Sequence, residues 1–164
     1  MKPIPSPPAK ERTAKDRPDP TPLALERFLP YRLSVLTNTV SRAIARLYAK
    51  RFGLSIPEWR VMAALGRYPE LAASEICGVT AMDKVQVSRA VGRMERRLLV
   101  SRTGDAEDRR RRVLRLTAKG EAIHAEIVPL ALEREAHLLA ALSLGEYREL
   151  DRLLVKLQAQ AALL

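Results

Sequence analysis

The sequence predicts a mainly α-helical fold with one small β-hairpin. Apolar residues recur at spacings of three and four through residues 23–98 and again through residues 118–164, which is the period of amphipathic helices. Between these regions, "LVSRT" and "RVLRLT" alternate in polarity as the two strands of a half-buried hairpin do. The 164 residues, of which 47% are hydrophobic, suffice for one domain with an appended region.

Residues 1–22 differ from the rest of the chain, because they hold seven of the eleven prolines and few apolar side chains. Such a segment cannot bury enough surface to offset the entropy of ordering it, so we expect a disordered N-terminal arm. It lacks the apolar centre of a signal peptide, and no apolar run approaches the roughly 18 residues of a membrane span. We therefore expect a cytoplasmic protein without a membrane partner.

Three helices are expected after this arm, within residues 23–79. The first covers about residues 23–52 and ends at Gly53. Its apolar stripe consists of Leu33, Leu36, Val40, Ile44 and Leu47. The second begins at Ser55, which has capping-box spacing to Glu58, and a short third helix fits residues 73–79.

Residues 83–98, "DKVQVSRAVGRMERRL", predict a basic amphipathic helix. Its buried face is expected to consist of Val87, Val91, Met94 and Leu98. The major groove of B-DNA is about 12 Å wide and admits such a helix, with long polar side chains turned towards base edges and phosphates. The expected DNA contacts of this recognition helix are Lys84, Val85, Gln86, Ser88, Arg89 and Arg93.

The region that contains this helix and the hairpin is strongly basic, and a run of arginines follows three acidic residues in the turn between the two strands. Residues 81–120 carry a net charge of +7, whereas residues 121–164 carry −3. A concentrated basic surface favours a polyanionic partner such as nucleic acid, and the alternatives are an anionic membrane or plain solubility. Arginines are attracted into a narrow A·T-rich minor groove, and a neighbouring aspartate can orient a guanidinium. The hairpin would then form a second DNA-contacting element, or wing, beside the recognition helix. The expected DNA contacts of this wing are Asp108, Arg109, Arg110, Arg111 and Arg112.

Alternation along the second strand predicts which side chains are buried. Leu114 and Leu116 are expected to face the core, and Val113 and Arg115 the opposite side.

Two helices should follow the hairpin. Thr117 can cap the first at Ala118, and Ser143 with Glu146 forms a capping box for the second (residues 118–164 in all).

The run "SEICGVTAMDKVQVSRAVGRMERRLLVSRTGDAEDRRRRVLRLTAKG" closely resembles the winged helix-turn-helix of the MarR family of bacterial transcription regulators. The wing signature of that family is roughly D-x-R-D-R-R, followed by a strand that ends in L-T-x-x-G. The matching residues are Asp105, Asp108, Arg109, Arg110, Leu116, Thr117 and Gly120. Glu107 stands where the family often has arginine, which favours Arg109 and Arg110 as the groove residues.

The resemblance implies a division of the chain and a mode of binding. Residues 54–117 would form the winged helix-turn-helix domain, and residues 23–53 with 118–164 a helical dimerisation region. A homodimer would then bind double-stranded DNA at a pseudo-palindromic operator, with half-sites about 34–36 Å apart, and act as a repressor. The long leucine stripes of the terminal helices favour the same arrangement, because a domain of this size cannot bury them alone.

The resemblance also implies a small-molecule effector, since family members commonly respond to aromatic or phenolic ligands. The ligand here would be aromatic or an acyl-CoA, and its binding would release the DNA. The candidate ligand-binding residues are Tyr31, Arg32, Trp59 and Arg60, of which Trp59 is also a candidate core residue.

No motif in the sequence points to catalysis, a cofactor or a metal. His124 and His137 have no cysteine or carboxylate cluster at metal-ligand spacing, so we expect exposed helix positions. Cys77, the single cysteine, is expected to be a small buried side chain. The sequence therefore predicts a regulator that is not an enzyme. The alternative left open is an architectural protein that binds nucleic acid without sequence preference.

Overall fold

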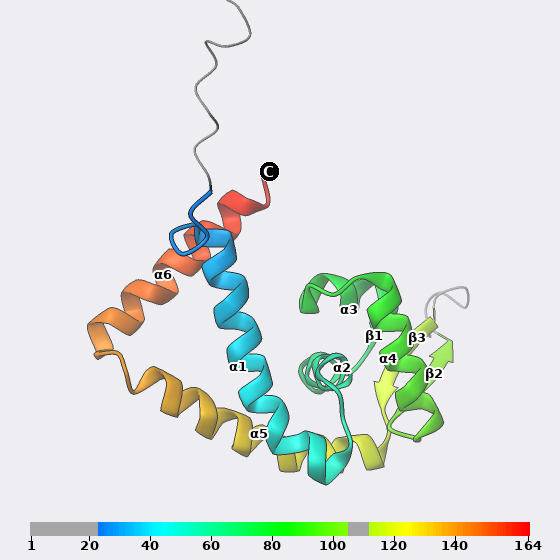
Figure 1. Ribbon diagram of the computed structural model, residues 1–164. Coiled ribbons are helices and arrows are strands. Elements are labelled where there is room, and N and C mark those ends of the chain that lie inside the picture. Colours follow the sequence, from blue (N-terminus) through cyan, green and yellow to red (C-terminus); the bar gives the residue numbers. More distant parts are fainter. Residues whose placement is uncertain (1–22, 105–111) are drawn as a thin grey trace, which may run out of the picture. The chain divides into compact units, whose positions relative to one another are not determined.

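The structure is a computed structural model that describes residues 23–104 and 112–164. The prediction of a mainly α-helical fold with a small β-hairpin is confirmed. The described elements are α1 (Leu29–Phe52), α2 (Ile56–Arg67), β1 (Leu71–Ala72), α3 (Ala73–Thr80), α4 (Lys84–Arg96), β2 (Val100–Gly104), β3 (Arg112–Leu116), α5 (Ala118–Leu139) and α6 (Leu144–Ala161) (Figure 1). Within these described ranges, no helix has the length and the apolar content that crossing a membrane requires.

The chain forms two compact units, Met1–Thr37 and Asn38–Leu164. The described part of the first unit is a turn followed by the start of α1, and all of its residues are exposed. The second unit contains the remainder of α1 and every other element. The expected division into DNA-binding and dimerisation regions stays a prediction.

The helix boundaries follow local signals in the sequence. Ser55 and Ser143 each accept a hydrogen bond from the backbone three residues on, and both capping boxes are complete. The Thr117 hydroxyl likewise accepts from the Gly120 amide at 3.1 Å. Gly53 ends α1 with a φ of 61°, a left-handed conformation that favours glycine. These four predicted boundaries are confirmed.

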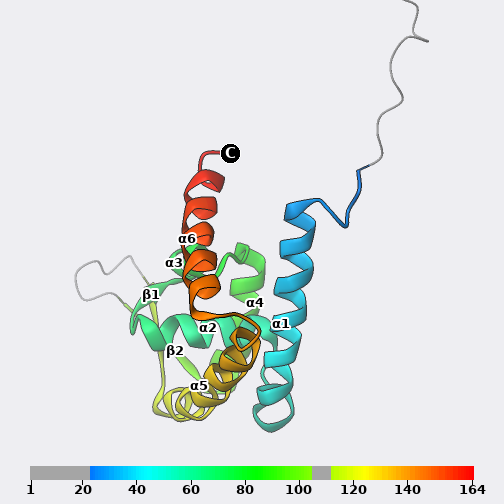
Figure 2. The ribbon, with the colours of Figure 1, turned by 90° about the vertical axis from the view of Figure 1, so that its left-hand side faces the viewer.

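The core of the second unit is built around α2, which packs against α3, α4, α5 and β3 (Figure 2). Its largest fully buried side chains include Tyr48, Leu54, Met62, Ile76, Met94, Leu99, Leu114 and Ile127. The helix-turn-helix pair α3 and α4 therefore rests on the same core as the hairpin strands. Such a shared core fixes the direction of α4 relative to the hairpin.

The sheet has three antiparallel strands in the order β1-β3-β2, so it contains one strand that the sequence did not predict. β1 is only two residues long, and Leu71 of β1 pairs with Leu114 of β3. β3 is thus the central strand, shielded by a neighbour on each side. Val113 and Leu114 are both buried, each 1% exposed, but only Leu114 belongs to the core cluster, in agreement with the prediction that Val113 faces the opposite side.

The end of α4 also differs from the prediction. The helical period places Leu98 on the buried face, but this residue is 70% exposed and adopts a φ of 56°. The Leu99 amide donates to the Met94 carbonyl and the Leu98 amide to the Glu95 carbonyl, both at 2.9 Å. This is the Schellman pattern that ends a helix. Because the helix stops at Arg96, its period no longer applies at Leu98, and Leu99 is buried instead.

Candidate nucleic-acid interface

The N-terminal half of α4 presents a polar face supported by a fully buried one. Val87, Ala90, Val91 and Met94 are at most 1% exposed. The Asp83 carboxylate accepts a hydrogen bond from the backbone N–H of Gln86 at 2.7 Å, which caps the helix. The exposed residues of this half are Lys84, Val85, Gln86, Ser88 and Arg89. They are five of the six residues that the sequence assigned to DNA contact.

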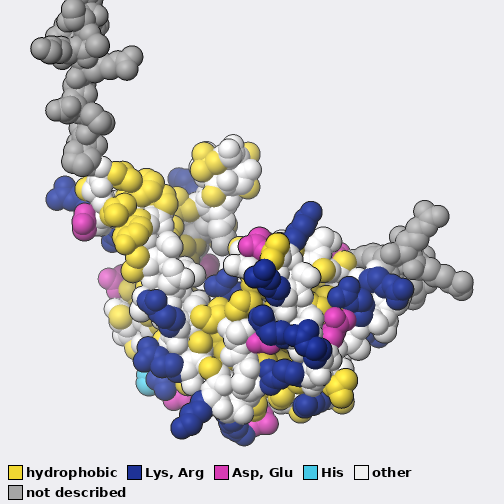
Figure 3. All heavy atoms as spheres, turned by 45° about the vertical axis from the view of Figure 1, so that its right-hand side comes forward, with side chains coloured by type: hydrophobic (Ala, Val, Ile, Leu, Met, Phe, Trp, Pro, Cys, Tyr) yellow, Lys and Arg dark blue, Asp and Glu magenta, His cyan; other side chains and the backbone are white. Residues whose placement is uncertain are grey.

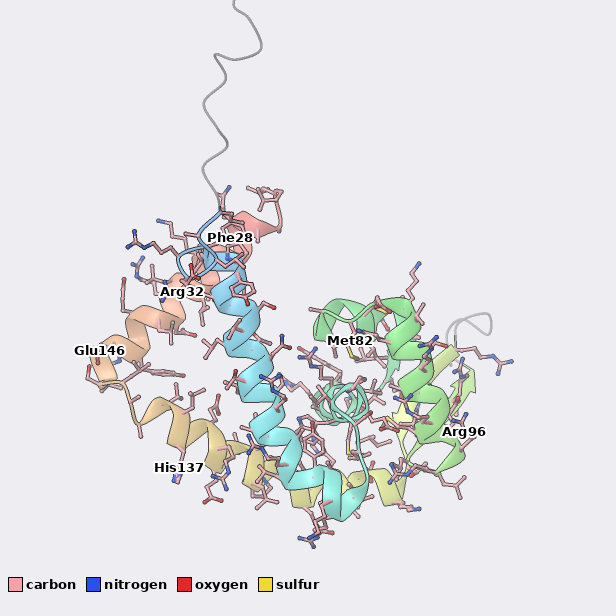
Figure 4. The ribbon with its side chains drawn as sticks, viewed as in Figure 1. Phe28, Arg32, Met82, Arg96, His137 and Glu146 are labelled. Carbon is pink, nitrogen blue, oxygen red and sulfur yellow. The ribbon has the colours of Figure 1, made fainter. Side chains whose placement is uncertain are left out.

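The turn before α4 holds this face in place. Met82, between α3 and α4, is only 5% exposed (Figure 4). Figure 3 shows Lys and Arg side chains gathered on the face that includes α4 and the hairpin strands. A rigid helix with a basic outer surface is the arrangement that a groove-binding helix needs.

Arg93, the sixth predicted contact, is placed differently from the other five. Its Nε atom lies 3.3 Å from Oε1 of Glu58, and its Nη2 atom lies 3.4 Å from the Ser55 hydroxyl. The guanidinium therefore engages the start of α2. Sequence reasoning missed this pairing, because residues 35 positions apart in the chain meet only through the fold.

Glu58 is the one buried charged residue in the described parts of the chain, at 4% exposed. Burial alone would raise the pKa of its carboxyl group. Hydrogen bonds from the side chain and backbone of Ser55, together with the Arg93 guanidinium, outweigh burial and hold that pKa below its usual value. Glu58 is therefore ionised at neutral pH, and its buried charge is compensated by these donors.

The C-terminal end of α4 is bound to the end of α1. Nη1 of Arg97 donates to the Gly53 carbonyl at 2.9 Å, and Nη2 donates to the Phe52 carbonyl. The Phe52 carbonyl is the last of α1 and the Gly53 carbonyl follows it, so neither can have a partner inside that helix. The sequence contained no signal for this contact, because Arg97 lies 44 and 45 positions from its partners and meets them only through the fold.

Two ion pairs hold the base of the hairpin. Nε of Arg102 lies 3.0 Å from the Glu95 carboxylate, which links β2 to α4, and Arg115 of β3 pairs with Glu70. Of the predicted wing contacts, Arg112 is exposed at the start of β3 and pairs in register with Gly104. Asp108, Arg109, Arg110 and Arg111 lie outside the described residues.

A pocket of about 400 Å³ lies between α2 and the end of α3. It is lined by Trp59, Arg60, Ala63, Ala64, Tyr68, Val79 and Thr80. Nη2 of Arg60 is 3.4 Å from the Ser41 hydroxyl. Trp59 and Arg60, two of the predicted ligand residues, thus share one pocket. Tyr31 and Arg32 are exposed residues of the first unit (Arg32 is labelled in Figure 4).

Trp59 packs between two other rings, tilted against Tyr48 and stacked on His124. Its centroid is 5.5 Å from that of Tyr48 and 6.1 Å from that of His124. Burial raises the pKa of Tyr48 to about 12, against a smaller lowering by Arg60. The predicted exposure of His124 is wrong, because its ring is half-buried and its burial lowers its pKa. His137 is exposed, as predicted (Figure 4).

The remaining polar residues give no sign of another chemistry. Among residues 23–104 and 112–164, no three His, Cys, Asp or Glu side chains are grouped as a metal site would require. Cys77 is half-buried and packs against the core, beside Lys84 and Val87. The prediction that it is a buried side chain is therefore only partly correct.

Comparison with known proteins agrees with this geometry. The model of the MarR family matches residues 52–111, which include α2, α3, α4 and β2. The transcriptional regulator HosA of Escherichia coli O111:H- is 35% identical over 103 residues, which cover 63% of this chain and 76% of that protein. The HTH-type transcriptional repressor Rv2887 of Mycobacterium tuberculosis is 28% identical over 131 residues, or 79% of this chain and 91% of the relative.

Solved structures give the same result over a longer part of the chain. The crystal structure of a MarR/EmrR family transcriptional regulator from Acinetobacter sp. ADP1 has a TM-score of 0.80 at 26% identity. The match covers 87% of this chain and all of that one. A MarR family regulator from Silicibacter pomeroyi DSS has a TM-score of 0.73, also at 26% identity, over 84% of this chain and 91% of that one. This chain belongs to the MarR family of DNA-binding transcriptional regulators.

Proposed function

We propose that this regulator is a homodimeric repressor that binds a pseudo-palindromic operator and leaves it when a small ligand binds. The observation that carries the proposal is the exposed row Lys84, Val85, Gln86, Ser88 and Arg89 on a helix whose opposite face is fully buried. Residues near the N-terminus of a recognition helix are the ones that reach base edges in helix-turn-helix proteins.

Each side chain in this row has a chemistry suited to DNA. Lys84 and Arg89 donate to phosphates, and Arg89 can also contact guanine. The Gln86 amide can pair with the two groups that adenine presents in the major groove, and Ser88 can donate to a phosphate or a base. Val85, which is 57% exposed, packs against a thymine methyl group.

The segment between β2 and β3 supplies the second part of the interface. In this proposal Arg109 and Arg110 enter the minor groove, Asp108 orients one of their guanidinium groups, and Arg111 and Arg112 contact phosphates. The exposed position of Arg112 supports a contact at this end of the hairpin.

A homodimer is supported by apolar surface that the single chain leaves uncovered. α6 has no buried residue. Its exposed apolar side chains include Leu144, Tyr147, Leu150, Leu153, Leu154, Val155 and Leu157, and residues Leu29, Leu33, Val35 and Leu36 of α1 are also exposed. Apolar surface of this extent on single helices is typical of an oligomer interface. Two-fold symmetry then requires two similar half-sites, about one helical turn of DNA apart.

The pocket lined by Trp59 and Arg60 is the proposed ligand site. An aromatic wall beside a guanidinium suits a small aromatic carboxylate or an acyl-CoA thioester. Calorimetric titration with salicylate and with cinnamoyl-CoA would test the two classes. The expected result is binding of one class that Arg60→Ala weakens, and binding of neither would reject both classes.

Selection from a random-sequence pool of duplexes identifies the operator. The affinity of the selected duplex is then compared by fluorescence anisotropy with that of a scrambled duplex at about 150 mM salt. One dimer per duplex and a preference of about 10³ or more would support a specific regulator. Equal, salt-sensitive binding to both duplexes would instead support the nonspecific architectural alternative.

A further inference from the structure

Two arginines at the C-terminal end of the recognition helix reach the same place in the fold. Arg93 lies in the last turn of α4 and Arg97 is its C-cap residue, four positions on, so they project from one side of the helix. Both contact the corner at which α1 ends and α2 begins, residues 52–58. The DNA-facing row of residues 84–89 lies in the other half of the same helix.

Arg97 neutralises the end of α1. The carbonyls at a helix C-terminus carry partial negative charge and lack partners, and a guanidinium offers them several fixed donors. Arg97 donates to Phe52 and Gly53 together, and a Cβ atom at Gly53 would lie 3.6 Å from its Nη2 atom. The guanidinium thus packs closely over the glycine that turns the chain.

Arg93 holds the other side of the corner. Its partner Glu58 belongs to the capping box of α2, and the carboxylate of Glu58 accepts from both the amide and the hydroxyl of Ser55. The cap of α2 and the position of α4 are therefore joined through one buried carboxylate. Arg96, which lies between the two arginines in sequence, is exposed (Figure 4).

We propose that Arg93 and Arg97 are positioning residues that set the angle of the recognition helix by anchoring its C-terminal half to the α1–α2 corner. The inference rests on the proposed function of residues 84–89. At about 1.5 Å per residue, those residues lie roughly 6 to 13 Å from Arg93 along the helix, so a tilt of about 10° at the anchor moves them by about 1 to 2 Å. Base contacts need tighter placement than that.

The experiment measures affinity for the selected and the scrambled duplex over a series of salt concentrations. Arg97→Ala should lower the preference for the selected duplex by about tenfold, comparable to the loss of one base contact, without changing the slope of log affinity against log salt. Arg97→Lys, which keeps a cation able to donate to both carbonyls, should restore most of the preference. Arg96→Ala is the matched control, and its preference should equal that of the wild type.

Glu58→Gln removes the partner of Arg93 on α2 and leaves every side chain of α4 unchanged. It should also reduce the preference with an unchanged salt slope, because a buried carboxylate cannot contact phosphate. Circular dichroism establishes that each variant is folded under the assay conditions. If Arg97→Ala and Glu58→Gln keep the wild-type preference, the proposal is overturned.

The proposal is also overturned if Arg97→Ala weakens both duplexes equally and lowers the slope by about 0.9, because that result identifies a phosphate contact. If the wild-type protein binds the selected and the scrambled duplex equally, the proposed specific binding of an operator is contradicted instead. The two failures are therefore distinguishable.

Discussion

Nε of Arg93 lies 3.3 Å from Oε1 of Glu58, and this contact joins the recognition helix to the cap of α2. The carboxylate side chain is 5% exposed, whereas that of Arg93 is 42% exposed. A buried charge that loses its partner is costly, so each of these residues depends on the other. The consequence can be measured in stability as well as in DNA binding.

Glu58→Gln should destabilise the protein by about 1–3 kcal/mol at neutral pH, because it removes charge-assisted hydrogen bonds in a buried place. Since folding lowers the pKa of Glu58, its contribution is present above the ordinary value of 4.5 and is lost as pH falls through the folded value. Urea unfolding at several pH values should therefore show the difference from wild type shrinking in acid. Glu95→Gln is the control: its pair with Arg102 is more exposed, and its loss should cost less than about 1 kcal/mol.

His124 predicts a second pH effect. Burial lowers its pKa from 6.5, so the folded protein disfavours the charged ring. The unfolded chain takes up the proton first, and stability should decline as pH falls below 6.5 until the folded value is passed. Arg115 and Glu121, which line the same pocket as His124, face it from β3 and α5. His124→Gln should flatten the decline in unfolding free energy, measured by urea denaturation at several pH values. A decline as steep as that of the wild type would exclude His124 as its source.

Gly120→Ala should be among the most destabilising substitutions in the chain. A Cβ atom there would lie 2.1 Å from the Leu99 carbonyl oxygen, and backbone cannot move aside as a side chain can. We expect a loss of about 2–4 kcal/mol, measured by chemical denaturation. Gly145→Ala is the matched control, because nothing lies within 4 Å of its added Cβ and it sits in the first turn of α6. Similar effects in the two variants would contradict the steric argument.

Leu98→Gly should stabilise the protein. A leucine in the left-handed region is strained by about 1–2 kcal/mol, and glycine removes that strain at an entropic cost of about 0.5–1 kcal/mol. Since Leu98 is 70% exposed, little apolar contact is lost, and the net gain should be about 0.5–1 kcal/mol. Thermal unfolding measures it. A lower melting temperature would mean that the Leu98 side chain makes a stabilising contact.

Arg109→Ala with Arg110→Ala should weaken DNA binding and flatten its salt dependence. Arginines in the minor groove lie beside the phosphates of both strands and displace condensed counterions, so each one that neutralises a phosphate contributes about 0.9 to the log–log slope. Gln86→Ala should instead relax the preference for one base pair, because an amide reads base edges and carries no charge. Anisotropy titrations with a set of single-base variants of the selected duplex separate the two outcomes. An unchanged slope would show that Arg109 and Arg110 do not contact the DNA.

Much of the fold follows from short-range patterns. Capping residues and positive-φ glycines act within one turn of helix, so the starts of α2, α5 and α6 and the end of α1 could be read directly from the sequence. The five exposed residues of the α4 row could also be predicted, because helical period alone separates them from Val87, Val91 and Met94.

The errors lie where distant segments meet. β1 is too short to carry a strand pattern, and it forms only because β3 offers it an edge. Arg93 and His124 looked exposed because their partners, Glu58 and Trp59, lie far away in the chain. Exposure of a polar residue on a helix depends on which neighbour the fold brings to it, and periodicity carries no information about that neighbour.

Trp59 is the only tryptophan in the chain, and its indole lies both at the pocket and beside two other rings. Trp59 lines the 400 Å³ pocket, and the ring centres of Tyr48 and His124 lie about 6 Å from its own. Indole emission shifts with the polarity and the charge of its surroundings. We therefore expect the fluorescence of this residue to report pocket occupancy and the protonation of His124 without any attached dye.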